Sequence, residues 1–106
     1  MIIGIGTDIC KIERVNLRIA KTILTDKEME IFNTLTLDSR KKEWLAGRFS
    51  AKEAIYKALD IKIPINQIEI LYDGEKPVCN IKDYKVHISI SHEKEYAIAY
   101  SLVEKD

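Results

Sequence analysis

The chain has 106 residues, which suffices for one hydrophobic core, so residues 1–106 are expected to fold as a single domain. With 46% hydrophobic and 32% charged residues the composition excludes an intrinsically disordered chain, and no apolar run is long enough to cross a bilayer. The formal net charge of zero argues against general nucleic-acid binding.

The first half of the sequence predicts one strand followed by helices. The β-branched segment at residues 2–6 indicates a short strand. Apolar residues at helical spacing predict an amphipathic helix over about residues 11–24. The segment T-D-K-E at residues 25–28 fits a capping box, which predicts a short helix over about 26–35. A segment without proline, about 40–59, is expected to form a long central helix.

The second half changes to a period of two residues, which predicts strands. The strand candidates after Pro64 are, in order, QIEILY, VCNI, KVHISIS and YAIAYSLV. The last two are separated by the turn HEKE and are expected to pair as an antiparallel hairpin. A strand, then helices, then several strands predict an α+β fold in which helices pack on one side of an antiparallel sheet.

The two cysteines and the N-terminus indicate a compartment. Cys10 and Cys79 stand far apart, without a C-x-x-C motif or metal-ligand spacing, as free thiols in a reducing environment do. The N-terminal residues lack the basic and long apolar regions of a secretory signal. A cytoplasmic location is therefore expected.

Two positive charges lie on the apolar side of the predicted central helix. At about 100° per residue, Arg48 and Lys52 fall about 40° and 80° from Trp44, inside the arc of apolar side chains. An unpaired charge on the core side of a helix is costly. Two explanations stay open: an internal salt bridge or aliphatic stems that reach past the core, and a bound phosphate group.

Three charged residues are candidates for a metal-assisted reaction. Asp8 is expected just past the end of the first strand, where a turn or cap residue is the ordinary explanation. Glu53 and Lys57 are four residues apart on one flank of the predicted helix, the spacing of a stabilising surface pair. Carboxylates brought together from a strand end and a helix would alternatively suit Mg²⁺, which also takes water and substrate phosphates as ligands.

Two further features allow a functional and an ordinary explanation. His92 ends the segment HISISH and is either a polar turn residue or part of a site. On the predicted helix over residues 11–24, four cations share one face, which we call the basic face: Lys11, Arg14, Arg18 and Lys21. The basic face is either a solvated surface or a docking surface for an acidic partner.

Three motifs resemble those of the bacterial holo-[acyl-carrier-protein] synthases, small 4′-phosphopantetheinyl transferases. IIGIGTDICKIERV resembles their G-I-G-x-D-I motif, WLAGRFSAKEAIYKAL their R-F-[AS]-x-K-E-A-x-x-K-A motif, and ISISHEKEYAIA their S-x-S-H-x-x-x-Y-A-x-A motif. The resemblance covers essentially the whole chain and implies the 4′-phosphopantetheinyl transferase fold. It implies transfer of 4′-phosphopantetheine from coenzyme A to a serine of apo acyl carrier protein, with 3′,5′-ADP as the second product.

The resemblance also implies catalytic roles. Asp8 and Glu53 would be the Mg²⁺ ligands, Glu53 would help to remove the proton of the attacking serine, and Lys57 would neutralise or protonate the departing phosphate. The residues that would bind coenzyme A are Arg48, Lys52, Lys57 and His92, with Arg40 or Lys41 at its 3′-phosphate.

For partners, the resemblance implies that the basic face docks the acidic helix beside the acceptor serine, and that the chain forms a homotrimer with active sites at subunit interfaces. Asp60 stands where the family usually has glycine. Two alternatives stay open: a non-catalytic module that binds carrier proteins, and a metal-dependent nucleotide phosphohydrolase.

Overall fold

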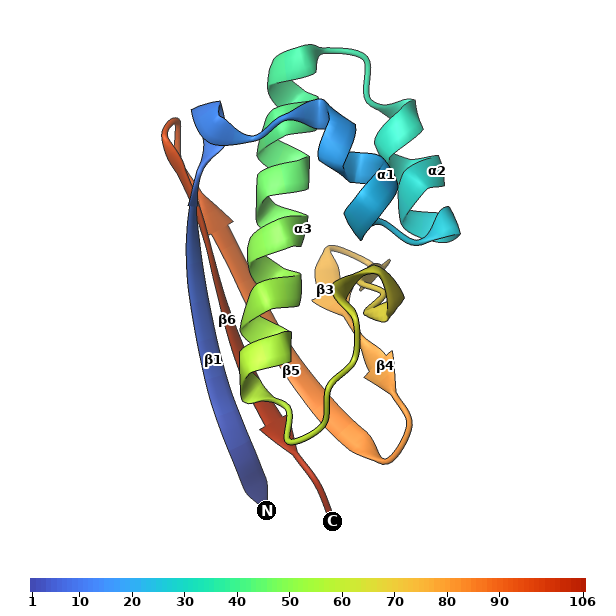
Figure 1. Cartoon of the computed structure of the whole chain (residues 1–106), viewed down its shortest axis with the longest axis vertical. Helices are drawn as coiled ribbons and strands as arrows, with labels where there is room; N and C mark the ends of the chain where they lie inside the picture. The colour runs from blue at the N-terminus through green and yellow to red at the C-terminus, as the bar shows by residue number, and fades with distance from the viewer.

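A computed structural model that describes residues 1–106 consists of a four-stranded antiparallel sheet with one long helix across one face (Figure 1). The helix is α3 (Asp38–Ala58). The strands lie in the order β1 (Ile2–Lys11), β6 (Tyr96–Glu104), β5 (Tyr84–His92) and β4 (Asn80–Ile81). The predicted α+β class, the central helix and the final hairpin are confirmed, and no helix has the length and apolarity that spanning a membrane requires.

Alternation along β5 and β6 gives the sheet one buried face. Ile90 of β5 lies opposite Ala99 of β6, and both side chains point to α3. The intervening residues point the other way, so Ser89 lies opposite the exposed Tyr100. Because side chains alternate between the two faces of a strand, the same pattern assigns every second residue of β1 to the helix side.

Two glycines let β1 lie directly on α3. A Cβ atom at Gly6 would overlap the carbonyl oxygen of Ala54, and one at Gly4 would overlap that of Ala58. Only a residue without a side chain fits such an approach. Asp8 follows two residues later on the same face of β1, opposite Ala99 of β6, and therefore also points to the helix.

The predicted helix over residues 11–24 is wrong. Strand β1 continues to Lys11, and the chain then passes through the 3-10 turns η1 (Ile12–Arg14) and η2 (Leu17–Ile19) into the short helix α1 (Ala20–Ile23). The amide of Ile12 donates to the carbonyl of Glu95, 2.8 Å away, which extends the pairing of β1 with β6. Ile12, Val15 and Ile23 are buried and Ile19 is half-buried, but successive turns place them in the core instead of one helix.

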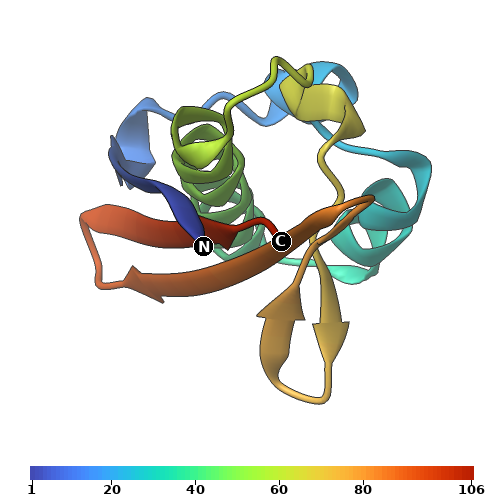
Figure 2. The same ribbon diagram turned by 90° about the horizontal axis from the view of Figure 1, so that it is seen from below.

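Helix α2 (Asp26–Thr34) follows the predicted capping box, in which Thr25 and Glu28 exchange hydrogen bonds. The chain then crosses to α3, and from its far end it returns through η3 (Ile65–Gln67). Strands β2 (Leu71–Asp73) and β3 (Lys76–Val78) form a hairpin of their own, outside the four-stranded sheet. Seen along the long axis, this hairpin projects away from the rest of the fold (Figure 2).

The core lies on both sides of α3. One cluster joins the first part of the helix to α1 and α2, with Leu45 at its centre. A second cluster joins the later part of the helix to the sheet and to the segment before β2, where Ile68 and Ile70 are fully buried. Helix α3 therefore fixes the positions of both the helical layer and the β2–β3 hairpin.

Candidate functional site

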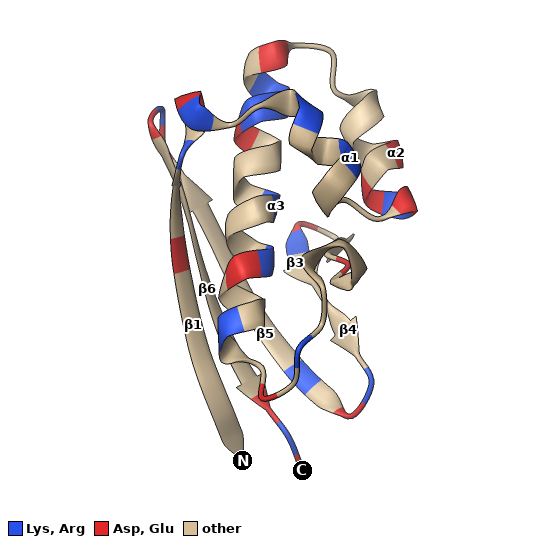
Figure 3. Cartoon of the chain, viewed as in Figure 1, with Lys and Arg blue, Asp and Glu red and all other residues tan.

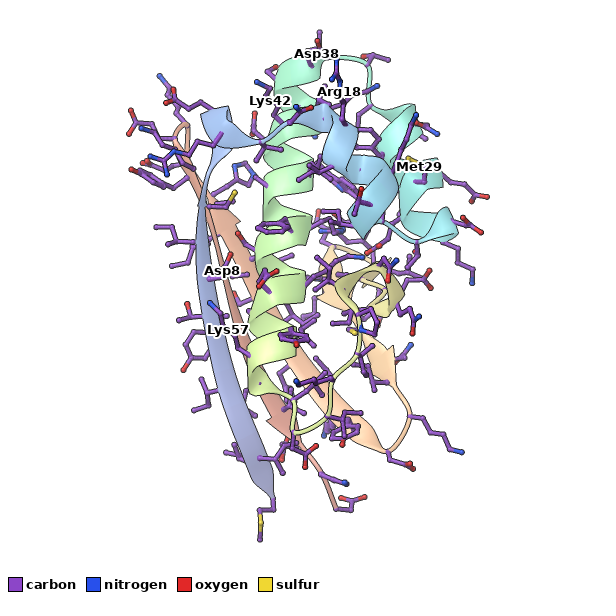
Figure 4. All side chains as sticks on the ribbon, viewed as in Figure 1. Asp8, Arg18, Met29, Asp38, Lys42 and Lys57 are labelled. Carbon is purple, nitrogen blue, oxygen red and sulfur yellow. The ribbon has the colours of Figure 1, made fainter.

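The seam between β1 and α3 brings Asp8 and Lys57 together (Figure 4). The ammonium of Lys57 donates to Asp8 Oδ1 at 3.2 Å and to the carbonyl oxygen of Thr7 at 3.1 Å. The Asp8 side chain is 17% exposed and that of Lys57 is 51% exposed. Asp8 thus lies within a long strand and not past the end of a short one, and β1 presents its carboxylate to the helix.

Glu53 stands one turn before Lys57 on the same flank of α3 and is half-buried. Lys57 thus contacts the Asp8 carboxylate of the strand and stands one helical turn after the Glu53 carboxylate of the helix. Such a donor set fits Mg²⁺, which takes one or two protein carboxylates and completes its shell with water and phosphate oxygens. No group of three or more His, Cys, Asp or Glu in the chain is arranged to hold a metal ion.

A cavity of about 250 Å³ lies between the first half of α3, strand β5 and the β2–β3 hairpin. Its lining includes three of the expected coenzyme A ligands, namely Arg40, Arg48 and His92. The other lining residues are Glu43, Trp44, Gly47, Tyr72, Glu75, Pro77 and Ile90. Lys41 is not among them, and its ammonium lies over the Phe32 ring, 5.1 Å from the centroid.

The sequence left an internal salt bridge open as an explanation for Arg48, but the structure has none. The residue is 3% exposed, and its Nε and Nη2 have no hydrogen-bond partner. Its Cζ lies 4.6 Å from the ring centroid of Trp44 and 4.6 Å from that of Tyr72. His92 is placed differently, since its Nδ1 lies 3.4 Å from Glu43 Oε2.

Lys52 departs from the expected role as a coenzyme A ligand. Its side chain is fully buried, and Nζ donates to Glu28 Oε1 at 2.6 Å and to the carbonyl oxygens of Ile23 and Ile65 at 2.5 and 3.1 Å. Burial lowers the pKa of Lys52, and the hydrogen bond to Glu28 opposes that shift. The internal salt bridge, left open for this residue, is what the structure has, because all three donors point into the protein.

Sequence reasoning missed the second role of Glu28. Its Oε1 accepts from the amide of Thr25 in the capping box, and its Oε2 accepts from the buried amide of Ile70, 2.9 Å away. The capping-box motif accounts only for the first contact. For the contacts of Glu28 with Lys52 and Ile70, the only signal in the sequence was a lysine on the apolar side of the helix without an assigned anion.

The basic face is not one face of a helix. Lys11 ends β1 and pairs with Glu13 at 3.4 Å, whereas the other three cations lie in η1, η2 and α1. All four are still at the surface, and Figure 3 shows basic residues following the chain from the end of β1 to α1. The local conformation differs from the expectation, but Arg14, Arg18 and Lys21 are exposed and in no salt bridge.

Asp60, which stands where the family usually has glycine, has a hydrogen-bond partner in the structure. Asp60 follows α3, and its Oδ1 accepts a hydrogen bond of 2.6 Å from the hydroxyl of Tyr84, at the start of β5. The hydrogen bond raises the pKa of Tyr84. A side chain at this position therefore links the end of the helix to the sheet.

The chain belongs to the 4′-phosphopantetheinyl transferase superfamily, whose sequence profile matches residues 4–101. It is 46% identical over 110 residues to the holo-[acyl-carrier-protein] synthase of Mycoplasma mycoides subsp. mycoides, covering 100% of this chain and 98% of that protein. It is 45% identical over 118 residues to the holo-[acyl-carrier-protein] synthase of Geobacillus sp. (strain WCH70), and this match covers 99% of this chain and 98% of that protein.

The fold is similar to the crystal structure of a holo-(acyl-carrier-protein) synthase from Bacillus anthracis str. Ames in complex with CoA (3′,5′-ADP). The TM-score is 0.89 at 37% sequence identity, and the match covers 100% of this chain and 99% of that one. Within the superfamily, the chain is therefore a member of the holo-[acyl-carrier-protein] synthase family, and the predicted enzyme class and fold are confirmed.

The buried pair gives a stability prediction. Replacing Lys52 by methionine leaves the Glu28 carboxylate buried without its cation, so we expect the free energy of unfolding to fall by about 3–5 kcal/mol. Urea denaturation followed by circular dichroism measures the change. The matched variant Lys42→Met, on the same helix but without an ion pair, should cost less than about 0.5 kcal/mol. Equal stability of the two variants would contradict the importance of the pair.

Proposed function

We propose that this chain transfers the 4′-phosphopantetheine group of coenzyme A to a serine of apo acyl carrier protein and releases 3′,5′-ADP. The observation that carries the proposal is the meeting of Asp8 and Lys57, beside Glu53, at the seam between β1 and α3. Membership of the family, with relatives matched over the full chain, supports the same reaction. The unpaired thiols of Cys10 and Cys79 suit a reducing compartment, so we place the reaction in the cytoplasm.

The reaction forms a bond between the serine oxygen and the phosphorus next to pantetheine, and breaks the bond from that phosphorus to 3′,5′-ADP. Glu53 accepts the serine proton, since a carboxylate at the seam can act as a general base. Lys57 stabilises the negative charge that develops on the departing phosphate. Asp8 and Glu53 would hold Mg²⁺, which, when bound, supplies positive charge to the diphosphate oxygens.

The cavity on the other side of α3 would hold the nucleotide part of coenzyme A. Arg40, Arg48 and His92 contribute donors to one space of about 250 Å³. Phosphate oxygens match the planar donor edge of arginine especially well.

Transfer is tested by incubating the protein with apo carrier protein, coenzyme A and Mg²⁺ and recording the intact mass of the carrier. We expect the carrier to gain one phosphopantetheine group. The variants Glu53→Gln and Lys57→Met should lower kcat by about 100-fold, because each removes a group that acts in the transition state. The exposed variant Glu30→Gln serves as the control.

The same assay separates the two alternatives. A non-catalytic module that binds carrier proteins would leave the carrier mass unchanged. A nucleotide phosphohydrolase would release phosphate from coenzyme A in the absence of the carrier. Either result would contradict the proposed transfer.

Docking of the carrier is assigned to the basic face, because four cations concentrate positive charge on a chain of zero net charge. Reversing two of them, Arg14→Glu with Arg18→Glu, should raise the KM for carrier protein about tenfold at low salt and leave that for coenzyme A nearly unchanged. Steady-state kinetics at two salt concentrations measure both constants. A similar rise in both KM values would count against this docking surface.

For the proposed homotrimer, the outer face of the sheet offers a surface for a subunit contact. Ile9 and Ile98 are paired across β1 and β6 and are 63% and 45% exposed. The neighbouring Tyr100 is 49% exposed, which makes a contiguous apolar surface of the kind that subunit contacts cover.

Size-exclusion chromatography with light scattering tests this assembly. We expect the mass of a trimer for the wild-type chain and of a monomer for Ile98→Glu, because burying the new charge at the interface is costly. The control Ile61→Glu changes an isoleucine that is equally exposed but lies outside the sheet. A wild-type monomer at micromolar concentration would refute the trimer.

A further inference from the structure

Arg48 is the one buried cation that no anion of the protein neutralises. Three charged side chains are buried, and two of them, Glu28 and Lys52, pair with each other. Arg48 is 3% exposed, and neither its Nε nor its Nη2 has a hydrogen-bond partner. Buried donors without partners are rare and costly, so their persistence calls for a physical reason.

Two aromatic rings stabilise the positive charge of Arg48, but they do not accept hydrogen bonds from its N–H donors. Trp44 and Tyr72 each lie 4.6 Å from Cζ, a distance at which a ring face attracts a guanidinium. Aromatic faces stabilise the positive charge, yet they do not replace oxygen acceptors in the plane of the guanidinium, where its N–H bonds point. The in-plane donors are therefore left for an acceptor that comes from outside the chain.

We propose that Trp44 and Tyr72 are positioning residues for Arg48: they keep water from its Nε and Nη2 and hold these donors ready for a phosphate group of coenzyme A. The inference rests on the proposed function, since it takes coenzyme A as the substrate. A dehydrated arginine gains more from a phosphate oxygen than a hydrated one, because no water has to leave its donors.

The Trp44 ring is held by a contact outside the cavity, and the Tyr72 ring is carried by a segment that is anchored in the core. Trp44 stands one turn before Arg48 on α3 and packs against Phe32 of α2, with 6.0 Å between ring centroids. Tyr72 is on the β2–β3 hairpin, two residues after the fully buried Ile70, whose amide donates to Glu28. The rings come from two separate parts of the fold, and each part has its own anchor in the core.

The ligand can reach Arg48 at a modest structural cost. Nε and Nη2 are covered, so an incoming phosphate has to move the ring of Tyr72, which is 45% exposed. The β2–β3 hairpin is hydrogen-bonded as a sheet of its own, and a shift of its tip breaks no bond of the four-stranded sheet. Glu43 and Glu75 also line the cavity, so the direction of the Arg48 donors, more than net charge, selects the anion.

Binding of 3′,5′-ADP tests the inference without any chemistry. Trp44 is the only tryptophan, so its emission, together with calorimetry, reports a ligand at Arg48. We expect Tyr72→Leu to raise the Kd about tenfold, because water then reaches Arg48 in the free protein, and Tyr72→Phe to stay within about twofold of the wild type. An unchanged Kd for Tyr72→Leu would overturn the inference.

A double-mutant cycle separates positioning of Arg48 from direct stacking on the nucleotide. If Tyr72 acts through Arg48, Tyr72→Leu should change the Kd less than about twofold in the background of Arg48→Met. The full tenfold effect in that background would overturn the inference, because the ring would then act on the ligand itself. In transfer assays, the KM for coenzyme A should rise in Tyr72→Leu while kcat changes little.

The outcomes also separate this inference from the proposed function. If the wild-type protein binds 3′,5′-ADP and the double-mutant cycle gives the expected Kd values, but no carrier is modified, the role of the rings would be supported and the transfer refuted. A wild-type protein that does not bind 3′,5′-ADP would overturn the inference.

Discussion

The close contact of β1 with α3 is the constraint on which the candidate site depends. Gly4 and Gly6 let the strand backbone lie against the helix backbone, and the alternation of the strand then directs Asp8 at the same helix. Asp8 and Lys57 are 49 positions apart in sequence, yet their side chains are in hydrogen-bond contact. A larger residue at either glycine would move the strand away and separate the carboxylate from its partners.

Three positive side chains of α3, namely Lys57, Lys52 and Arg48, have three different surroundings. Lys57 is half-exposed at the seam, Lys52 is buried against Glu28, and Arg48 is buried without an anion. Because Glu28 also accepts the amide of Ile70, the buried ion pair ties α2 and the approach to the β2–β3 hairpin to the central helix. The buried Lys52–Glu28 pair thus helps to fix the helix that carries Arg48 and Lys57.

Local patterns predicted the elements that depend on local chemistry. The capping box placed α2, the absence of proline placed α3, and strict alternation placed the β5–β6 hairpin. The helix predicted over residues 11–24 failed because β1 still pairs with β6 at Lys11, and the apolar residues beyond it are carried by η1, η2 and α1 in place of one helix. The angular positions of Arg48 and Lys52 on the predicted helix indicated that both charges need an anion. Only the tertiary contacts show that Lys52 has one within the chain, Glu28, and that Arg48 has none. Tyr72 escaped prediction because its partner is 24 residues earlier and on another element.

We propose that Asp8 and Glu53 would together hold a divalent cation, which would supply positive charge for the diphosphate of coenzyme A. Mn²⁺ in place of Mg²⁺ allows a direct measurement, because electron paramagnetic resonance distinguishes the free ion from the bound ion. We predict that the wild-type protein with coenzyme A removes free Mn²⁺ from solution, and that Asp8→Asn and Glu53→Gln each weaken this binding by about tenfold or more. Undiminished Mn²⁺ binding in either folded variant would contradict the account.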